Sequence, residues 1–116
     1  MTEARTGTFA GLEAERPYAG IVRRTLQSEH MTLAEYTFEP GASFPLHHHA
    51  QEQVTLVAEG DVALTLGDRT ETLSAGAWSV VPGGTEHGIT AGADGARIVA
   101  IISPRREAAG EITLAS

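Results

Sequence analysis

The segment from residue 47 to residue 49 carries three consecutive histidines, His47, His48 and His49. In a β-strand, residues two apart face the same side, so His47 and His49 point together while His48 points to the opposite side. Neutral imidazoles are good ligands for zinc, iron, copper and nickel. The pair therefore predicts a candidate site for a divalent metal; a packing role or a solvated cluster of histidines is the alternative.

Two later positions supply further donors. A turn follows His49, and the next strand returns alongside, which brings Glu52 or Gln53 near the two rings. His87 comes after the tight Pro82-Gly83-Gly84 turn. An amide oxygen adds a hard, neutral donor to a set of imidazoles.

The elements that must position these side chains are short strands. Thirteen glycines and five prolines divide the chain into segments rich in valine, isoleucine, leucine and threonine. Many short strands at near-regular spacing predict an all-β sandwich or barrel. The two-residue Gly67-Asp68 link suits a tight hairpin. The predicted strands are Ile21–Leu26, Met31–Phe38, Pro45–His49, Gln53–Ala58, Val62–Leu66, Arg69–Leu73, Trp78–Val81, His87–Ala91 and Arg97–Ile102.

Composition excludes several classes of function. The chain of 116 residues has the length of one domain, and it contains neither cysteine nor lysine, which excludes thiolate sites and Schiff-base chemistry. Fifteen acidic residues against eight arginines give a net charge of −7, which disfavours nucleic-acid binding. No signal-like start and no apolar run of membrane-spanning length occur. We expect a soluble, cytoplasmic protein that binds no membrane.

Some strands are apolar on both faces, and residues 98–102 contain no polar side chain. One face fills the barrel, and the other must also be shielded from water. A second copy of the chain packed against this outer face would shield it, which predicts a homodimer. The alternative is that loops, including the first twenty residues, cover the outer faces. We divide the chain into an N-terminal arm or edge strand (1–20), a barrel (21–107) and a C-terminal tail (108–116), whose ends are frayed or form swapped edge strands.

The glycine, proline and histidine spacings resemble the two signature motifs of the cupin superfamily. From Gly41 five residues lead to His47, one more leads to His49, three to Gln53 and six to Gly60; from Gly76 five lead to Pro82, one to Gly84 and two to His87. The resemblance implies a small, single-domain cupin, a double-stranded β-helix or jelly-roll barrel of six to eight strands. It also implies one divalent metal (Zn, Mn, Fe, Ni or Cu) held by His47, His49, Gln53 and His87.

This chain departs from the cupin pattern at two positions. Glutamate is the commoner ligand where Gln53 stands, and alternation predicts that Glu52 points away. The second motif usually ends in asparagine, where this chain has Ala91. A neutral ligand set leaves the ion its full +2 charge, so the site should favour a small anionic ligand and act as a Lewis acid. A closed metal that only rigidifies the barrel is the alternative.

The stretch from Val22 to Glu107 also resembles the small cupins that convert unsaturated uronates to keto sugars in pectin and alginate breakdown. Those relatives are expected to carry an aspartate and a phenylalanine facing the pocket, where this chain has Ala100 and Ile102, while Arg106 matches their arginine. The loss of the carboxylate removes an obvious proton-transfer group.

Arg106 and Tyr36 are the candidate catalytic residues, with His30 as a further pocket candidate. The alternative for Arg106 is a solvated surface side chain. Trp78 is assigned to core or dimer packing, and Glu86 to an outward charge. The favoured function is a metal-dependent isomerase or tautomerase of uronate-like or enol acids. A cupin dioxygenase acting on diketones or flavonols and a non-catalytic binding module are the alternatives.

Overall fold

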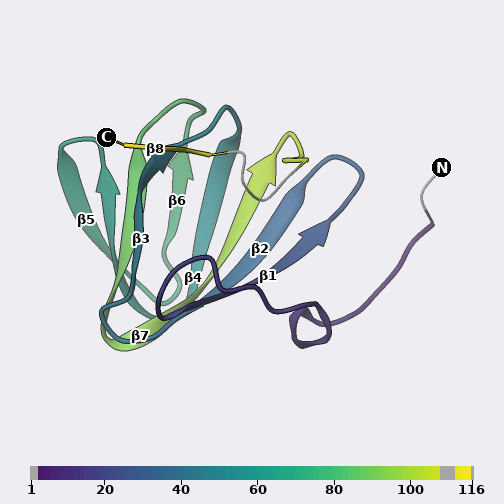
Figure 1. Ribbon diagram of the computed structural model, residues 1–116, viewed down its shortest axis with the longest axis horizontal. Helices are drawn as coiled ribbons and strands as arrows, with labels where there is room; N and C mark the ends of the chain where they lie inside the picture. Colours follow the sequence, from purple (N-terminus) through teal and green to yellow (C-terminus); the bar gives the residue numbers. More distant parts are fainter. Residues whose placement is uncertain (1–2, 108–111, 116) are drawn as a thin grey trace.

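The computed structural model describes residues 3–107 and 112–115, and these form the predicted all-β jelly-roll as one strongly curled sheet (Figure 1). The strands are β1 (Ile21–Gln27), β2 (Thr32–Phe38), β3 (Ser43–His48), β4 (Glu52–Leu66), β5 (Arg69–Ser74), β6 (Trp78–Val81), β7 (His87–Ser103) and β8 (Thr113–Leu114), preceded by a short 3-10 helix, η1 (Phe9–Gly11). No helix within the described part of the chain is long and apolar enough to cross a membrane.

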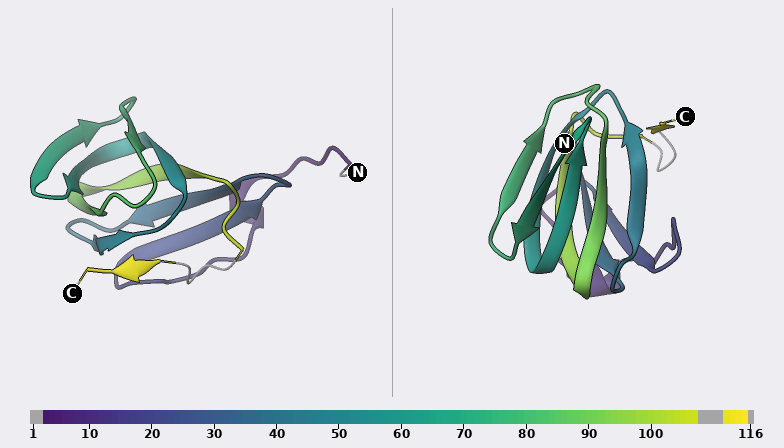
Figure 2. Two further views of the ribbon diagram at one scale, coloured as in Figure 1. Left: turned by 90° about the horizontal axis from the view of Figure 1, so that it is seen from above. Right: turned by 90° about the vertical axis from the view of Figure 1, so that its left-hand side faces the viewer.

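The two longest strands, β4 and β7, form the centre of the sheet. One edge of β7 pairs with β3 over residues 87–90 and with β2 over residues 96–102, and its other edge pairs with β4. The edge of β4 that faces away from β7 pairs with β6 near the start of β4 and with β5 near its end. Figure 2 shows the resulting curl, with β5 on the side remote from the N-terminal segment.

Two strands are longer than predicted, because the expected breaks between strands at residues 59–61 and 92–96 are bends within a strand. The segments Gln53–Ala58 and Val62–Leu66 are one strand, β4, and the segments His87–Ala91 and Arg97–Ile102 are one strand, β7. Gly60 and Gly95 adopt φ angles of 75° and 74°, and the register between the two strands shifts on either side of Gly60. A Cβ atom on Gly60 would lie 2.1 Å from the Gly95 carbonyl oxygen. Glycine thus lets both strands bend together while the ladder continues.

Alternation along the strands separates an inner from an outer face. On β7, Ile98, Ala100 and Ile102 are buried inside, whereas Val99 and Ile101 are half-buried outside. Inner residues of β2 and β4 join Ile98 and Ala100 in one core. The buried members of this core are Ile21, Ala34, Tyr36, Phe38, Phe44, Val57, Val62, Leu64, Ile89, Ala91, Ala96, Ile98 and Ala100.

The chain ends on either side of the barrel pack against it. On the N-terminal side, Arg24 of β1 donates hydrogen bonds to the carbonyls of Ala10 and Leu12. On the C-terminal side, β8 pairs with β3 of its own chain, with Leu114 opposite His47. Of the predicted tail 108–116, residues 108–111 and 116 lie outside the described part.

The N-terminal arm leaves part of the outer face uncovered. Leu56 of β4 is 43% exposed, and Trp78 and Val80 of β6 are 67% and 50% exposed. Leu56 pairs directly with Trp78 in the sheet, so these side chains are neighbours. Of the two roles expected for Trp78, packing in the barrel core is therefore wrong, because alternation on β6 turns the side chain outward, while dimer packing stays a prediction.

Candidate metal centre

Three histidines converge on the inner face from two paired strands. His47 lies in β3 directly opposite His87, the first residue of β7, and His49 follows the end of β3. The ring centroids are 4.3 Å apart for His47 and His87, 4.9 Å for His49 and His87, and 5.6 Å for His47 and His49. One nitrogen from each ring lies within 4.8 Å of the others, so the three buried rings fit a metal site.

Backbone carbonyls fix the orientation of all three rings. The Nδ1 atoms of His47, His49 and His87 lie 2.8, 3.0 and 2.9 Å from the carbonyl oxygens of residues 45, 51 and 85. A carbonyl only accepts, so each Nδ1 carries the proton and each Nε2 keeps a lone pair. This is the arrangement that holds a metal-ligating histidine in its coordinating tautomer.

Gln53 brings a fourth donor to the rings. Its Oε1 lies 3.1 Å from His49 Nε2, while its Nε2 donates to Thr55 Oγ1 at 3.0 Å. In this orientation two lone pairs face each other, since His49 already carries its proton on Nδ1. His87 Nε2 is buried and has no hydrogen-bond partner within the described residues. A cation among these atoms would satisfy both features, so the donor set fits a divalent ion.

The electrostatics of the site keep the rings neutral. Burial is the main cause, and it lowers the pKa of His47 to about 4 and also lowers the pKa values of His49 and His87. The hydrogen bonds to the backbone oppose the shift, whereas the positive Arg106 guanidinium adds to it in all three cases. Neutral imidazoles can coordinate a metal without first losing a proton.

A cavity extends from the rings into the barrel, with a free volume of about 20 Å³, which is room for one or two water molecules. Its walls are mostly aromatic and aliphatic, and no acidic side chain lines it among the described residues. Arg106 supplies its one formal charge. The lining residues are Tyr36, Phe38, Phe44, His47, Gln53, His87, Gly88, Ile89, Ile98 and Arg106.

The structure brings both candidate catalytic residues to this cavity. Arg106 is 5% exposed, so the solvated surface alternative is wrong. Tyr36 is buried, and its ring packs edge-on against Phe44 with centroids 5.7 Å apart. Ala100 and Ile102, where the resemblance to the uronate-converting cupins implies an aspartate and a phenylalanine, are buried on the inner face of β7.

Other candidates lie elsewhere. His30 is exposed on the turn between β1 and β2, so its assignment to the pocket is wrong. Glu52 is exposed while Gln53 is buried, as alternation predicts, and Glu86 is also exposed. His48 turns away from the cavity at a half-buried position opposite Thr113 of β8.

Sequence reasoning missed a partly buried ion pair next to Tyr36. Arg23 of β1 donates to Glu15 at 3.2 Å and pairs across the sheet with Tyr36. Burial disfavours its charge, but interactions with Glu15 and Tyr36 outweigh this and raise the pKa of Arg23. Alternation from buried Ile21 could have placed Arg23 inside, because residues two apart share a face.

Comparison with known proteins identifies the family. The cupin domain family matches residues 34–102, more than half of the chain, and the chain belongs to that family. The uncharacterized protein SCO3923 of Streptomyces coelicolor is 30% identical over 94 residues, which cover 80% of this chain and 90% of the relative.

Solved structures show the same fold. An RmlC-like cupin from Shewanella frigidimarina superposes with a TM-score of 0.82 at 25% identity, covering 90% of this chain and 95% of that one. KdgF from a Halomonas species gives 0.78 at 25% identity, covering 84% and 93%. A variant of the oxalate decarboxylase of Bacillus subtilis gives 0.86 at 19% identity, covering 98% of this chain but 33% of its own length, which supports the fold alone.

Proposed function

We propose that this cupin is a metal-dependent enzyme that isomerises or tautomerises a small, oxygen-rich carboxylate. His47, His49, His87 and Gln53 would hold one divalent ion. The observation that carries the proposal is the charge of the cavity: neutral donors and the Arg106 guanidinium line it, with no acidic side chain among the described residues. Such a cavity is complementary to an anion.

The metal would supply Lewis acidity that stabilises negative charge on a substrate oxygen. Arg106 would bind the substrate carboxylate, because a guanidinium makes two-point, charge-assisted hydrogen bonds with that group. The apolar walls formed by Phe38, Phe44 and Ile98 would exclude water and strengthen these interactions.

Tyr36 would transfer the proton. Conversion of an enol to its keto form moves one proton from oxygen to carbon, without gain or loss of other atoms. A phenol can donate to the carbon and recover a proton from the enol oxygen, and Tyr36 supplies a phenol to the cavity lining. Ala100 and Ile102 provide no carboxylate to perform this step.

Two similarities support an enolisable acid as the substrate. The chain resembles the uronate-converting cupins from Val22 to Glu107, and it shares its fold with KdgF at 25% identity over most of both chains. The small free volume favours a compact substrate or one whose far end remains outside the barrel.

The test uses protein loaded in turn with zinc, manganese, iron, nickel or copper. Under anaerobic conditions, an unsaturated uronate should lose the absorbance of its conjugated enol acid. Oxygen uptake with a diketone or flavonol would instead indicate a dioxygenase, and no turnover with any metal would indicate a binding module. Arg106→Gln should raise KM about tenfold or more, whereas Arg69→Gln on exposed β5 should not.

We also propose that a second copy of the chain covers the outer apolar face and forms a homodimer. Support comes from the neighbouring exposed side chains of Leu56, Trp78 and Val80, which a monomer would leave in water.

A further inference from the structure

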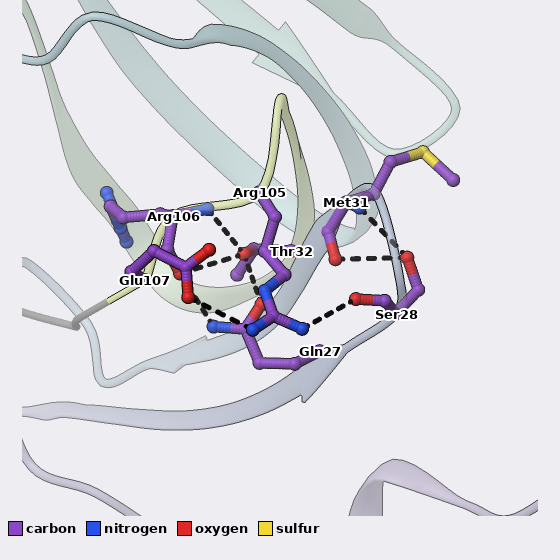
Figure 3. Close-up of polar contacts among 7 residues, drawn as sticks. All are labelled: Gln27, Ser28, Met31, Thr32, Arg105, Arg106 and Glu107. Carbon is purple, nitrogen blue, oxygen red and sulfur yellow. Dashed lines mark hydrogen bonds and ion pairs between the residues drawn. The ribbon is translucent and has the colours of Figure 1, made fainter. Parts of the chain in front are cut away.

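Two adjacent arginines at the end of the barrel have different surroundings. Arg105 donates to the Ser28 carbonyl at 3.2 Å and to Glu107 at 3.0 Å, on the outside of the β1–β2 turn. The Arg106 side chain points away from this cluster, as Figure 3 shows, and lines the cavity. The backbone at residue 106 therefore determines whether a guanidinium reaches the site.

That backbone is held on both sides by side chains from distant parts of the sequence. Thr32 Oγ1 accepts a hydrogen bond from the Arg106 N–H at 3.0 Å, and Gln27 Nε2 donates to the Arg106 carbonyl at 2.8 Å. Thr32 also donates to Gln27 Oε1 at 2.5 Å, so the two side chains form one unit (Figure 3). Gln27 ends β1, Thr32 begins β2, and they pair directly across the hairpin.

We infer that Gln27 and Thr32 are positioning residues that fix Arg106 as the anion-binding group of the site, an inference that rests on the proposed function. A long arginine side chain loses much conformational freedom when it binds a ligand. A tethered backbone removes part of that freedom before binding, which increases affinity through preorganisation. The rigid hairpin supplies the tether, so the carboxylate site depends on residues that do not contact the ligand.

The burial of Thr32 supports this role. Thr32 is 2% exposed, so its hydroxyl is a fully buried donor and acceptor. Removing the hydroxyl leaves the Arg106 N–H without its partner among the described residues. The expected response is a shift of residue 106 toward another hydrogen-bond acceptor, which moves the guanidinium away from its present place.

The experiment measures anion affinity in the full chain loaded with cobalt(II), whose visible absorption responds to ligands. Malonate is the probe. Thr32→Val should weaken malonate binding about three- to tenfold, the size expected for one buried hydrogen bond. Thr32→Ser keeps the hydroxyl and should bind within about twofold of the original protein. All variants should retain one equivalent of cobalt.

A matched control separates positioning from stability. Thr25→Val also removes a threonine hydroxyl from the inner side of the hairpin, where it bonds Glu15 at 3.2 Å instead of Arg106. It should lower the melting temperature without changing malonate affinity. If Thr32→Val does not fold, Gln27→Leu provides the second test, because it removes the bond to the Arg106 carbonyl and should weaken malonate in the same way.

The outcomes distinguish this inference from the proposed function. If Arg106→Gln leaves malonate affinity unchanged, the anion-binding role of Arg106 fails, and the inference fails with it. If Arg106→Gln weakens malonate at least about tenfold but folded Thr32→Val and Gln27→Leu do not, only the positioning role is wrong. A loss shared equally by Thr25→Val would also overturn the positioning role, since it would reflect general destabilisation.

Discussion

The inner and outer faces of β4 carry side chains of the opposite polarity to that usually found at buried and exposed positions. Inside, Gln53 and Thr55 are buried polar side chains, whereas outside, Leu56 is an exposed apolar one. The neighbouring strand β6 continues the outer pattern with Trp78 and Val80. Water would favour the opposite arrangement on both faces.

Burying polar side chains and exposing apolar ones both cost free energy, and the two faces differ in how far the chain itself compensates for that cost. On the inner face, hydrogen bonds hold the Gln53 amide nitrogen and the Nδ1 atoms of the three converging imidazoles, and the described residues leave His87 Nε2, which faces the shared centre, without a partner. The exposed outer residues have no such compensation. The inner face thus fits a metal ion, whereas no described part of the chain covers the exposed residues of the outer face.

The largest expected effect is loss of the metal. His49→Ala should reduce metal affinity more than about 100-fold, because loss of a partner that only orients a ligand already costs about 10- to 100-fold. His48→Ala is the matched control, since its ring turns away from the cavity. Elemental analysis of both purified variants measures the effect. A full metal equivalent in His49→Ala would show that the inner face does not bind the metal through His49.

The second effect is a pH dependence confined to protein freed of metal. Burial holds the pKa of His47 at about 4, below its ordinary value of 6.5. Between these values the unfolded chain binds more protons than the folded one, so stability falls as pH decreases. From pH 7 to pH 4 this residue alone removes about 3 kcal/mol of unfolding free energy. Urea denaturation at several pH values measures how steeply the free energy of unfolding falls as the pH decreases, and His47→Gln should make this fall less steep. An equally steep fall in that variant would show that His47 is not its cause.

The third effect tests the outer face. Trp78→Glu places a charge at the centre of the proposed dimer contact and should weaken association at least about 30-fold, the size of an interface hot spot. Thr72→Glu on exposed β5 is the control. Sedimentation analysis measures both, and a monomeric starting protein would show that a second copy does not cover these residues.

The smallest effect concerns charge on the inner face. Gln53→Glu should retain the metal but weaken malonate about two- to tenfold, because the carboxylate lowers the formal charge of the site from +2 to +1. Gln53→Asn, which keeps the neutral amide, is the control. Equal malonate affinity in Gln53→Glu and the original protein would contradict the argument from charge.

Much of the site follows from local spacing. Period-two alternation predicts that His47 faces away from His48 and that Gln53 faces away from Glu52, because only local backbone geometry is involved. The motif spacing also predicts the meeting of His87 with His47, through the resemblance to cupins. These predictions need no knowledge of side-chain contacts between remote segments.

Other features depend on contacts that the local sequence does not encode. The resemblance points to Arg106, but its burial does not follow from local periodicity, and its backbone is bonded to Gln27 and Thr32, more than seventy residues earlier. The continuity of β4 through Gly60 depends on the facing bend at Gly95. Considered within its own segment, Gly60 followed by Asp61 predicts a turn between two strands as readily as a bend within one strand.

The most direct test of the central claim is a crystal structure of the metal-loaded protein with anomalous diffraction at the metal edge. We predict one strong peak within about 2.0–2.3 Å of the Nε2 atoms of His47, His49 and His87, with each Nδ1 still bonded to its backbone carbonyl. A metal bound outside the barrel, or through Nδ1 after rotation of the rings, would contradict the account.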